Sequence, residues 1–221
     1  MRQGYPGHVA ACASRPGQRD TRHVYSARAL GTCCAVHALI LVDMQRDFFN
    51  AEPLRTQAAP MVQRANELVR RAAEVDAPVV LVRTLHSPDG ATWALNMSED
   101  GQGVAIAGTE GAELLEGLSS SDAIEVHKTR DSAFVGTDLE ATLRCLGVDR
   151  LVLGGVSTEA CVAMTAADAY ARDFRVVIAG DVVASAQRDA HRAALDWLES
   201  QYRQPTRSND QIEFAPSHVP G

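Results

Sequence analysis

Five short apolar runs, separated by helical segments, limit what this chain can fold into. The runs are rich in Val, Ile and Leu with no sustained polar alternation, and they span residues 38–44, 78–85, 123–128, 150–156 and 175–184. Strands that are buried on both faces of a parallel sheet have this composition. Between the runs, apolar residues recur with a period near 3.6, as in Met61, Ala65, Leu68 and Ala72. The alternation predicts a three-layer α/β/α sandwich around a mostly parallel, Rossmann-like sheet of roughly six strands.

The length and composition favour one folded domain. The chain has 221 residues, of which 46% are hydrophobic, enough for one domain with its own core. Residues 1–36 mix Arg, Gly, Pro and Ser without periodicity, so we expect a flexible N-terminal extension followed by a domain over 37–215. Residues 86–109 are Gly-rich and irregular, which predicts a substrate-facing excursion or an oligomer contact.

Charge and cysteine content exclude several classes of partner. The net charge is −7 and no stripe of Lys or Arg occurs, which argues against nucleic acid as a partner. No apolar stretch reaches the roughly 20 residues that span a bilayer, and no signal-peptide core is present, so we expect no membrane partner and a cytoplasmic location. The five cysteines show neither CxxC nor zinc-site spacing, which predicts reduced thiols.

Three chemically useful residues follow the ends of different predicted strands. Asp43 ends the first run and Lys128 the third, whereas Cys161 follows the fourth run after the bend "GGVS". Ligands of open parallel sheets bind at the carboxyl ends of the strands. The sequence therefore predicts that an acid, a base and a thiol meet at one edge of the sheet.

This trio suits nucleophilic acyl transfer. A free thiol has a pKa of about 8.5, and a helix N-terminus and a nearby ammonium both favour the nucleophilic thiolate. A carboxylate can take the thiol proton and return it to a leaving amine, while N–H groups of the bend face the oxyanion. Each residue also has an ordinary interpretation: Asp43 as a helix cap, Lys128 as a solvated charge and Cys161 as buried apolar filler. Their joint placement favours the catalytic interpretation.

Three blocks of the chain resemble a known family. "ALILVDMQRDFF", "KTRDSAF" and "LVLGGVSTEACVAMTAADAYARDFRVVIAGDVVAS" look like, in this order, the signature blocks of the isochorismatase-like superfamily of cysteine hydrolases. The resemblance covers about residues 38–200. It implies a parallel sheet flanked by helices, with Asp43 as general acid/base, Lys128 as charge partner and Cys161 as nucleophile. It also implies a non-proline cis peptide between Val156 and Ser157, with the N–H groups of Ser157 and Cys161 forming an oxyanion hole.

The resemblance also separates branches of the family. Isochorismatases proper typically carry glycine at the nucleophile position, so Cys161 favours the amidohydrolase branch, which cleaves a C–N bond through a thioester acyl-enzyme. Nicotinamidases carry a metal site after the second strand, an Asp-x-His followed by another His. The corresponding stretch "RTLHSPDGATWALN" offers only His86, which we expect to be a loop hydrogen-bonding residue. The resemblance therefore implies no catalytic metal and no cofactor, and it argues against nicotinamide as the substrate.

The substrate stays open among small amides. The candidates are a streptothricin-type antibiotic lactam, which would imply antibiotic resistance, a ureide and a carbamoyl compound. We expect four residues to bind the substrate: Phe48, Trp93, Asp131 and Glu159. Acids near the trio would favour a cationic substrate, and Trp93 would close over the ligand or pack against a neighbouring subunit.

Two other functions are compatible with the sequence. An isochorismatase-type vinyl ether hydrolase is the first alternative, and a non-catalytic binding domain, which would tolerate a missing triad member, is the second. Relatives are commonly dimers or tetramers, so the resemblance implies a homodimer or a homotetramer.

Overall fold

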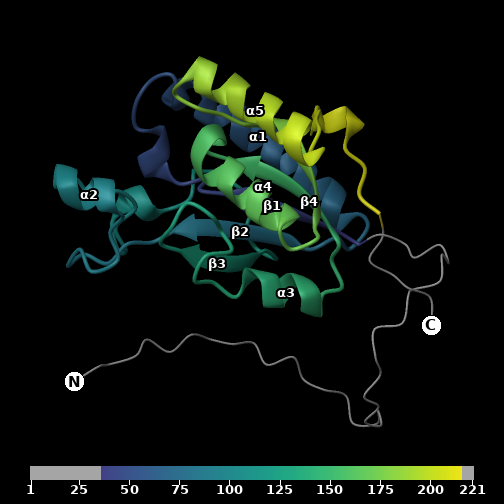
Figure 1. Cartoon of the computed structure of the whole chain (residues 1–221), viewed down its shortest axis with the longest axis horizontal. Coiled ribbons are helices and arrows are strands. Elements are labelled where there is room, and N and C mark those ends of the chain that lie inside the picture. The colour runs from purple at the N-terminus through teal and green to yellow at the C-terminus, as the bar shows by residue number, and fades with distance from the viewer. Residues whose placement is uncertain (1–35, 216–221) are drawn as a thin grey trace, which may run out of the picture. The chain divides into compact units, whose positions relative to one another are not determined.

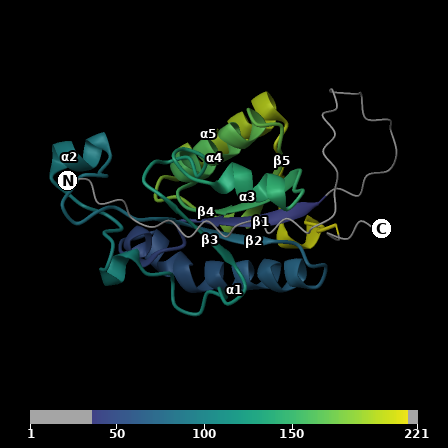
Figure 2. The same ribbon diagram turned by 90° about the horizontal axis from the view of Figure 1, so that it is seen from below.

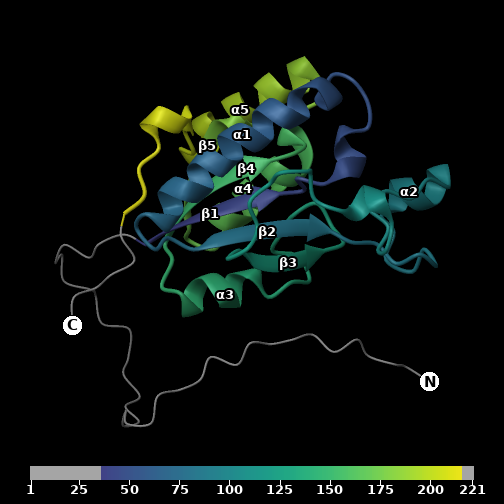
Figure 3. The ribbon, with the colours of Figure 1, turned by 180° about the vertical axis from the view of Figure 1, so that it is seen from behind.

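A six-stranded parallel sheet forms the centre of the protein. The computed structural model describes residues 36–215, so the predicted extension lies, apart from Val36, outside the described residues. The strands follow the order β3-β2-β1-β4-β5-β6, as Figure 3 shows for the five longer ones. Every neighbouring pair is parallel. The strands are β1 (His37–Val42), β2 (Val79–Thr84), β3 (Ile124–Lys128), β4 (Arg150–Gly155), β5 (Arg175–Val183) and β6 (Thr206–Arg207).

Helices cover both faces of this sheet. Figure 2 shows α1 (Leu54–Ala73) on one side, and α3 (Leu139–Cys145), α4 (Ala163–Tyr170) and α5 (Arg188–Tyr202) on the other. Shorter helical turns connect the layers: η1 (Arg46–Phe49), α2 (Leu95–Asp100), η2 (Glu110–Ala112), η3 (Thr158–Val162) and η4 (Asn209–Gln211). The predicted α/β/α sandwich is confirmed. Within the described residues, no helix is both long and apolar enough to cross a bilayer.

Strand β1 explains why the apolar runs show no alternation. Successive side chains of a strand point to opposite faces. Ile40 and Val42 pack in the cluster that contains α3, α4 and α5, whereas Leu39 and Leu41 pack in the cluster that contains α1. Both faces are buried from residue 38 to residue 42, so these positions of β1 need apolar side chains. The edge strand β3 differs, because its burial alternates.

The carboxyl ends of the strands position the candidate site. The chain leaves β1 toward β2 on one side, and β4 pairs with β1 on the other, so the loops after β1 and β4 diverge at this point. Gly155 ends β4 at φ +127, and a Cβ there would lie 2.0 Å from the carbonyl oxygen of Val42. Only glycine fits this position, which lets β4 lie against β1 next to the bend. Residues 86–109 contain α2, which projects from the same end of the sheet (Figure 1).

Candidate active site

Asp43, Lys128 and Cys161 meet at the carboxyl ends of β1, β3 and β4. The Nζ atom of Lys128 lies 2.8 Å from Oδ2 of Asp43 and 3.3 Å from Sγ of Cys161. The exposed fractions of Asp43, Lys128 and Cys161 are 0%, 2% and 9%. The structure thus brings the three predicted residues together in a setting that is nearly closed to bulk water.

Thr84, the last residue of β2, joins this group although the sequence did not single it out. Its hydroxyl donates to Oδ1 of Asp43 at 2.8 Å and accepts a hydrogen bond from Nζ of Lys128, also at 2.8 Å. Its backbone N–H donates to the same Asp43 oxygen at 3.0 Å. The ammonium of Lys128 has three donors. It donates hydrogen bonds to Thr84 and Cys161 and forms an ion pair with Asp43.

Gln45 supports the group from behind. It is fully buried, and its side-chain oxygen accepts the N–H of Thr84 at 2.9 Å. Its amide group donates to the carbonyls of Thr84 and Ala112, at 2.9 and 2.8 Å. The sequence offers two signals: Thr84 is a polar residue near the end of the apolar run 78–85, and Gln45 lies two residues after Asp43 in the first block.

The charges of the group favour a protonated thiol at rest. Burial and the carboxylate of Asp43 raise the pKa of Cys161 well above its ordinary value, and the opposing charge of Lys128 does not offset them. Burial on its own would lower the pKa of Lys128, but Asp43 and Cys161 reverse the effect and the net shift is upward. Desolvation penalises the charged sulfur, so the stabilisation of the thiolate by Lys128 that the sequence suggests is outweighed in the resting protein.

The two carboxylate oxygens of Asp43 have different surroundings. Its Oδ1 atom accepts two hydrogen bonds from Thr84, and its backbone has φ 54, a conformation that Asp adopts more readily than most residues. Its Oδ2 atom lies beside Lys128 but accepts no well-aligned hydrogen bond from the described residues. Oδ2 is therefore the less fully hydrogen-bonded oxygen of the carboxylate.

The bend after β4 shapes the other side of the thiol. The peptide between Val156 and Ser157 is cis, as the resemblance implies. The π-helical turn η3 then carries Cys161, and both the N–H and the hydroxyl of Thr158 donate to the carbonyl of Ala184 at 3.0 Å. No carbonyl in the described loops and turns accepts the N–H of Ser157.

A cavity of about 410 Å³ opens over this group. Lys128, Ser157 and Cys161 border it, and Phe48, Met97 and Val104 are among the apolar residues of its wall. Small-molecule pockets span roughly 300–1,000 Å³. The cavity is in the lower part of that range.

Two of the four predicted substrate-binding residues border the cavity. Phe48 lies in its wall, and Oδ1 of Asp131 lies 4.0 Å from Sγ of Cys161. Trp93 does not border it, because its indole N–H donates to the carbonyl of Ser87 at 3.1 Å and its ring packs against Gly103 in the same loop.

Glu159 also lies away from the cavity. Its Oε1 atom accepts a hydrogen bond from Ser185 at 2.8 Å. Residues two apart on a helical turn face different directions, so the turn that presents Cys161 directs Glu159 elsewhere. Glu159 therefore ties η3 to the segment that follows β5.

The metal site of nicotinamidases does not fit these residues. Nδ1 of His86 hydrogen-bonds with the carbonyl oxygen of Thr92 at 2.9 Å, and burial lowers the pKa of His86. Over residues 36–215, no group of three or more His, Cys, Asp or Glu side chains is arranged to hold a metal ion.

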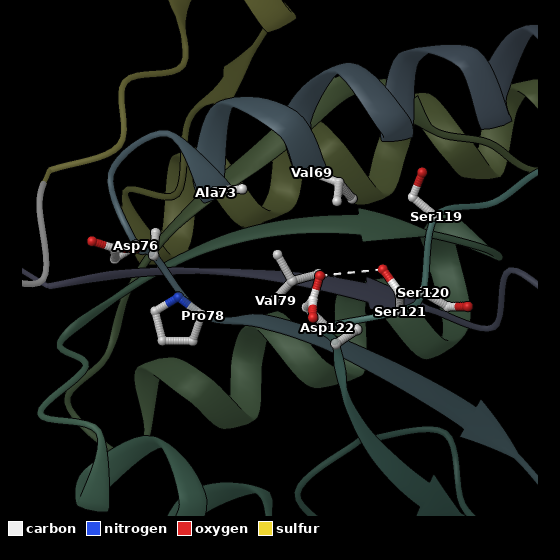
Figure 4. Close-up of a pocket in the computed structure, with 11 residues that line it drawn as sticks. Val69, Ala73, Asp76, Pro78, Val79, Ser119, Ser120, Ser121 and Asp122 are labelled. Carbon is white, nitrogen blue, oxygen red and sulfur yellow. Dashed lines mark hydrogen bonds between the residues drawn. The ribbon is translucent and has the colours of Figure 1, made fainter.

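A second cavity of about 410 Å³ lies at the amino ends of β2 and β3. Figure 4 shows Val69 and Ala73 of α1 on one side and the serines of the 119–121 loop on the other. Asp76 and Asp122 are its titratable residues. Its one hydroxyl–carboxylate pair, Ser121 donating to Asp122 at 3.2 Å, is exposed, and no Lys, Arg or His of the described residues borders the cavity. The cavity over Cys161 is therefore the candidate active site.

The comparison with protein families decides the identity of the fold. The isochorismatase domain matches residues 37–210. The chain belongs to the isochorismatase family. A probable inactive nicotinamidase of Arabidopsis thaliana is 36% identical over 183 residues, which cover 76% of this chain and 91% of the relative.

Two further relatives give the range of the family around this chain. Streptothricin hydrolase of Streptomyces noursei is 33% identical over 151 residues, 68% of this chain and 50% of the relative. The crystal structure of N-carbamoylsarcosine amidase from Thermoplasma acidophilum matches with a TM-score of 0.69 at 28% identity, covering 80% of this chain and 98% of that chain. The predicted superfamily is confirmed, and the protein is an isochorismatase-family hydrolase.

Proposed function

We propose that this protein is a cysteine amidohydrolase that cleaves the C–N bond of a small amide through a thioester acyl-enzyme. The observation that carries the proposal is the contact of one buried ammonium, Lys128, with both the carboxylate of Asp43 and the sulfur of Cys161. Amidohydrolases among the relatives support the same reaction class.

The first half of the reaction forms the thioester. Sγ of Cys161 attacks the amide carbon as its proton passes to Oδ2 of Asp43, and Lys128 stabilises the charge that develops on sulfur. The carbonyl oxygen becomes an oxyanion and accepts hydrogen bonds from the N–H groups of Ser157 and Cys161. Asp43 then gives its proton to the leaving nitrogen, the C–N bond breaks, and the amine departs.

The second half consumes water. Asp43, again a carboxylate, removes a proton from a water molecule that attacks the thioester carbon, and the C–S bond breaks. The proton returns to sulfur, so the products are the amine and the carboxylic acid and the enzyme regains its thiol. Because the resting thiol is protonated, attack requires Asp43 as a base rather than a preformed thiolate.

The cavity limits the size of the substrate. A volume of about 410 Å³ suits a compact carbamoyl compound or ureide, whereas a larger antibiotic lactam would have to extend beyond the cavity. A homodimer or homotetramer and a cytoplasmic location stay predictions, of which size-exclusion chromatography with light scattering tests the first.

A substrate panel with two variants tests the proposal. Wild type is assayed against primary amides, ureides, lactams and isochorismate. The readouts are release of ammonia or amine from the amides and of the products of ether cleavage from isochorismate. Cys161→Ala should abolish amide turnover, and intact-protein mass spectrometry should detect an acyl adduct on the wild type alone. Full activity of Cys161→Ser on an amide would show that the nucleophile is assigned wrongly.

The same panel separates the alternatives. Hydrolysis of isochorismate that survives Cys161→Ala identifies a vinyl ether hydrolase. Binding without turnover or adduct, for every compound, identifies a non-catalytic domain.

A further inference from the structure

Asp131 brings a second carboxylate to the nucleophile. It lies three residues after Lys128, and its Oδ1 atom is 4.0 Å from Sγ of Cys161. It is the one carboxylate among the described residues that border the active-site cavity. Its side chain is exposed rather than buried, so an incoming substrate can reach it.

When no cation is bound to it, the Asp131 carboxylate disfavours the proposed attack of Cys161. Negative charge develops on sulfur and on the carbonyl oxygen during the attack, and a carboxylate 4 Å away repels it. The charge of Asp131 is one of the causes that raise the pKa of Cys161. A cation that binds Asp131 would remove this penalty.

No cationic side chain of the described residues forms an ion pair with Asp131. Lys128 donates hydrogen bonds to Thr84 and Cys161 and forms its ion pair with Asp43. The lowered pKa of His86 favours its neutral form.

Arg130 borders the same cavity but is held by the loop. Its Nη1 atom donates to the carbonyls of Thr92 and Thr129, at 2.9 and 2.5 Å. The guanidinium is therefore attached to backbone oxygens, and it does not neutralise the neighbouring carboxylate through a hydrogen bond.

We propose that Asp131 selects amides that carry a protonated amine close to the scissile bond. The ammonium of such a substrate donates to the Asp131 carboxylate while its carbonyl carbon lies over Sγ of Cys161. Binding then neutralises the charge that opposes attack, so the cation contributes to kcat as well as to KM. Amides with a carboxylate at the same place are rejected. This inference rests on the proposed amidohydrolase function.

A first experiment measures the field of Asp131 without any turnover. Cys161 of the full chain is modified with a cationic and an anionic methanethiosulfonate reagent of equal size, and the peptide that contains Cys161 is quantified by mass spectrometry. Asp131→Asn should lower the cationic-to-anionic rate ratio about tenfold, because it removes one negative charge beside the sulfur. Asp100→Asn, an exposed acid at the end of α2, is the matched control and should leave the ratio unchanged. An unchanged ratio in Asp131→Asn overturns the inference.

A second experiment measures selectivity among amides of similar shape: β-alaninamide (cationic), butyramide (neutral) and succinamate (anionic). Wild type should prefer β-alaninamide, and Asp131→Asn should lower kcat/KM for that compound about tenfold and raise it for succinamate. A preference for succinamate that disappears in Arg130→Gln overturns the inference. The two proposals can fail separately. If no compound of the substrate panel is hydrolysed but Asp131→Asn lowers the cationic-to-anionic modification ratio as expected, the amidohydrolase function is refuted, whereas the effect of the Asp131 charge on Cys161 is confirmed.

Discussion

Replacing Lys128 with Met should destabilise the protein by about 3–5 kcal/mol. The side chains of Lys128 and Asp43 are 1% and 0% exposed, and their charged atoms lie 2.8 Å apart. At an effective dielectric constant of about 20, two unit charges at this distance attract by about 6 kcal/mol. Removing the ammonium forfeits this attraction and leaves the carboxylate buried without a cation, although relaxation and water entry recover part of the loss.

Urea unfolding of the full chain at pH 7 measures the effect. Arg188→Met, which removes the same charge from an exposed position, is the control and should stay within about 0.5 kcal/mol of wild type. The double variant with Asp43→Asn should be more stable than the sum of the two single variants predicts, by about 2–3 kcal/mol, because it no longer contains an orphaned carboxylate. If Lys128→Met unfolds within about 1 kcal/mol of wild type and the double variant shows no coupling, the pair is not buried as described.

Four shorter predictions test other parts of the site. Thr84→Val should lower kcat/KM roughly 30- to 150-fold at unchanged fold by circular dichroism, because a hydrogen bond to a charged group contributes about 2–3 kcal/mol. Gly155→Ala should cost more than about 3 kcal/mol in urea unfolding, because its Cβ would collide with a carbonyl, whereas Gly101→Ala, with open space around it, should cost about 1 kcal/mol. Lys128→Arg should abolish turnover and slow alkylation of Cys161. The raised pKa of Cys161 contributes stability that is fully present below the unfolded pKa of about 8.5 and is lost as pH rises through the folded pKa. The free energy of unfolding of Cys161→Ala should therefore fall less than that of wild type between about pH 8 and pH 11.

The fold could be read from the sequence wherever burial leaves a pattern. The runs that became β1, β2, β4 and β5 are apolar because both faces of the sheet are covered. Strand β6 has two residues and η3 one turn, so neither is long enough to show a period. Helix α2 is also short, and its Leu95 is exposed, which removes the amphipathic signal that marks α1.

The site could be predicted only in part, for a different reason. Asp43 and Cys161 were found by their place after apolar runs, but Thr84 and Gln45 act through hydrogen bonds across neighbouring strands. Such bonds depend on register, which a single sequence does not give. The direction of a side chain on a short turn is equally hidden in a sequence, so the pattern did not reveal that Glu159 bonds to Ser185 rather than bordering the cavity.

One composition signal does point to the site. Lys128 is the single lysine among 221 residues, and the other twenty basic residues are all arginine. A guanidinium is planar and its donors lie in one fork, whereas an ammonium presents three donors from one compact atom. At this position the donors must reach a carboxylate, a hydroxyl and a sulfur that belong to three different elements. The chain has arginine at its other twenty Lys or Arg positions, and it has lysine at position 128, where a carboxylate, a hydroxyl and a sulfur lie around a single nitrogen atom.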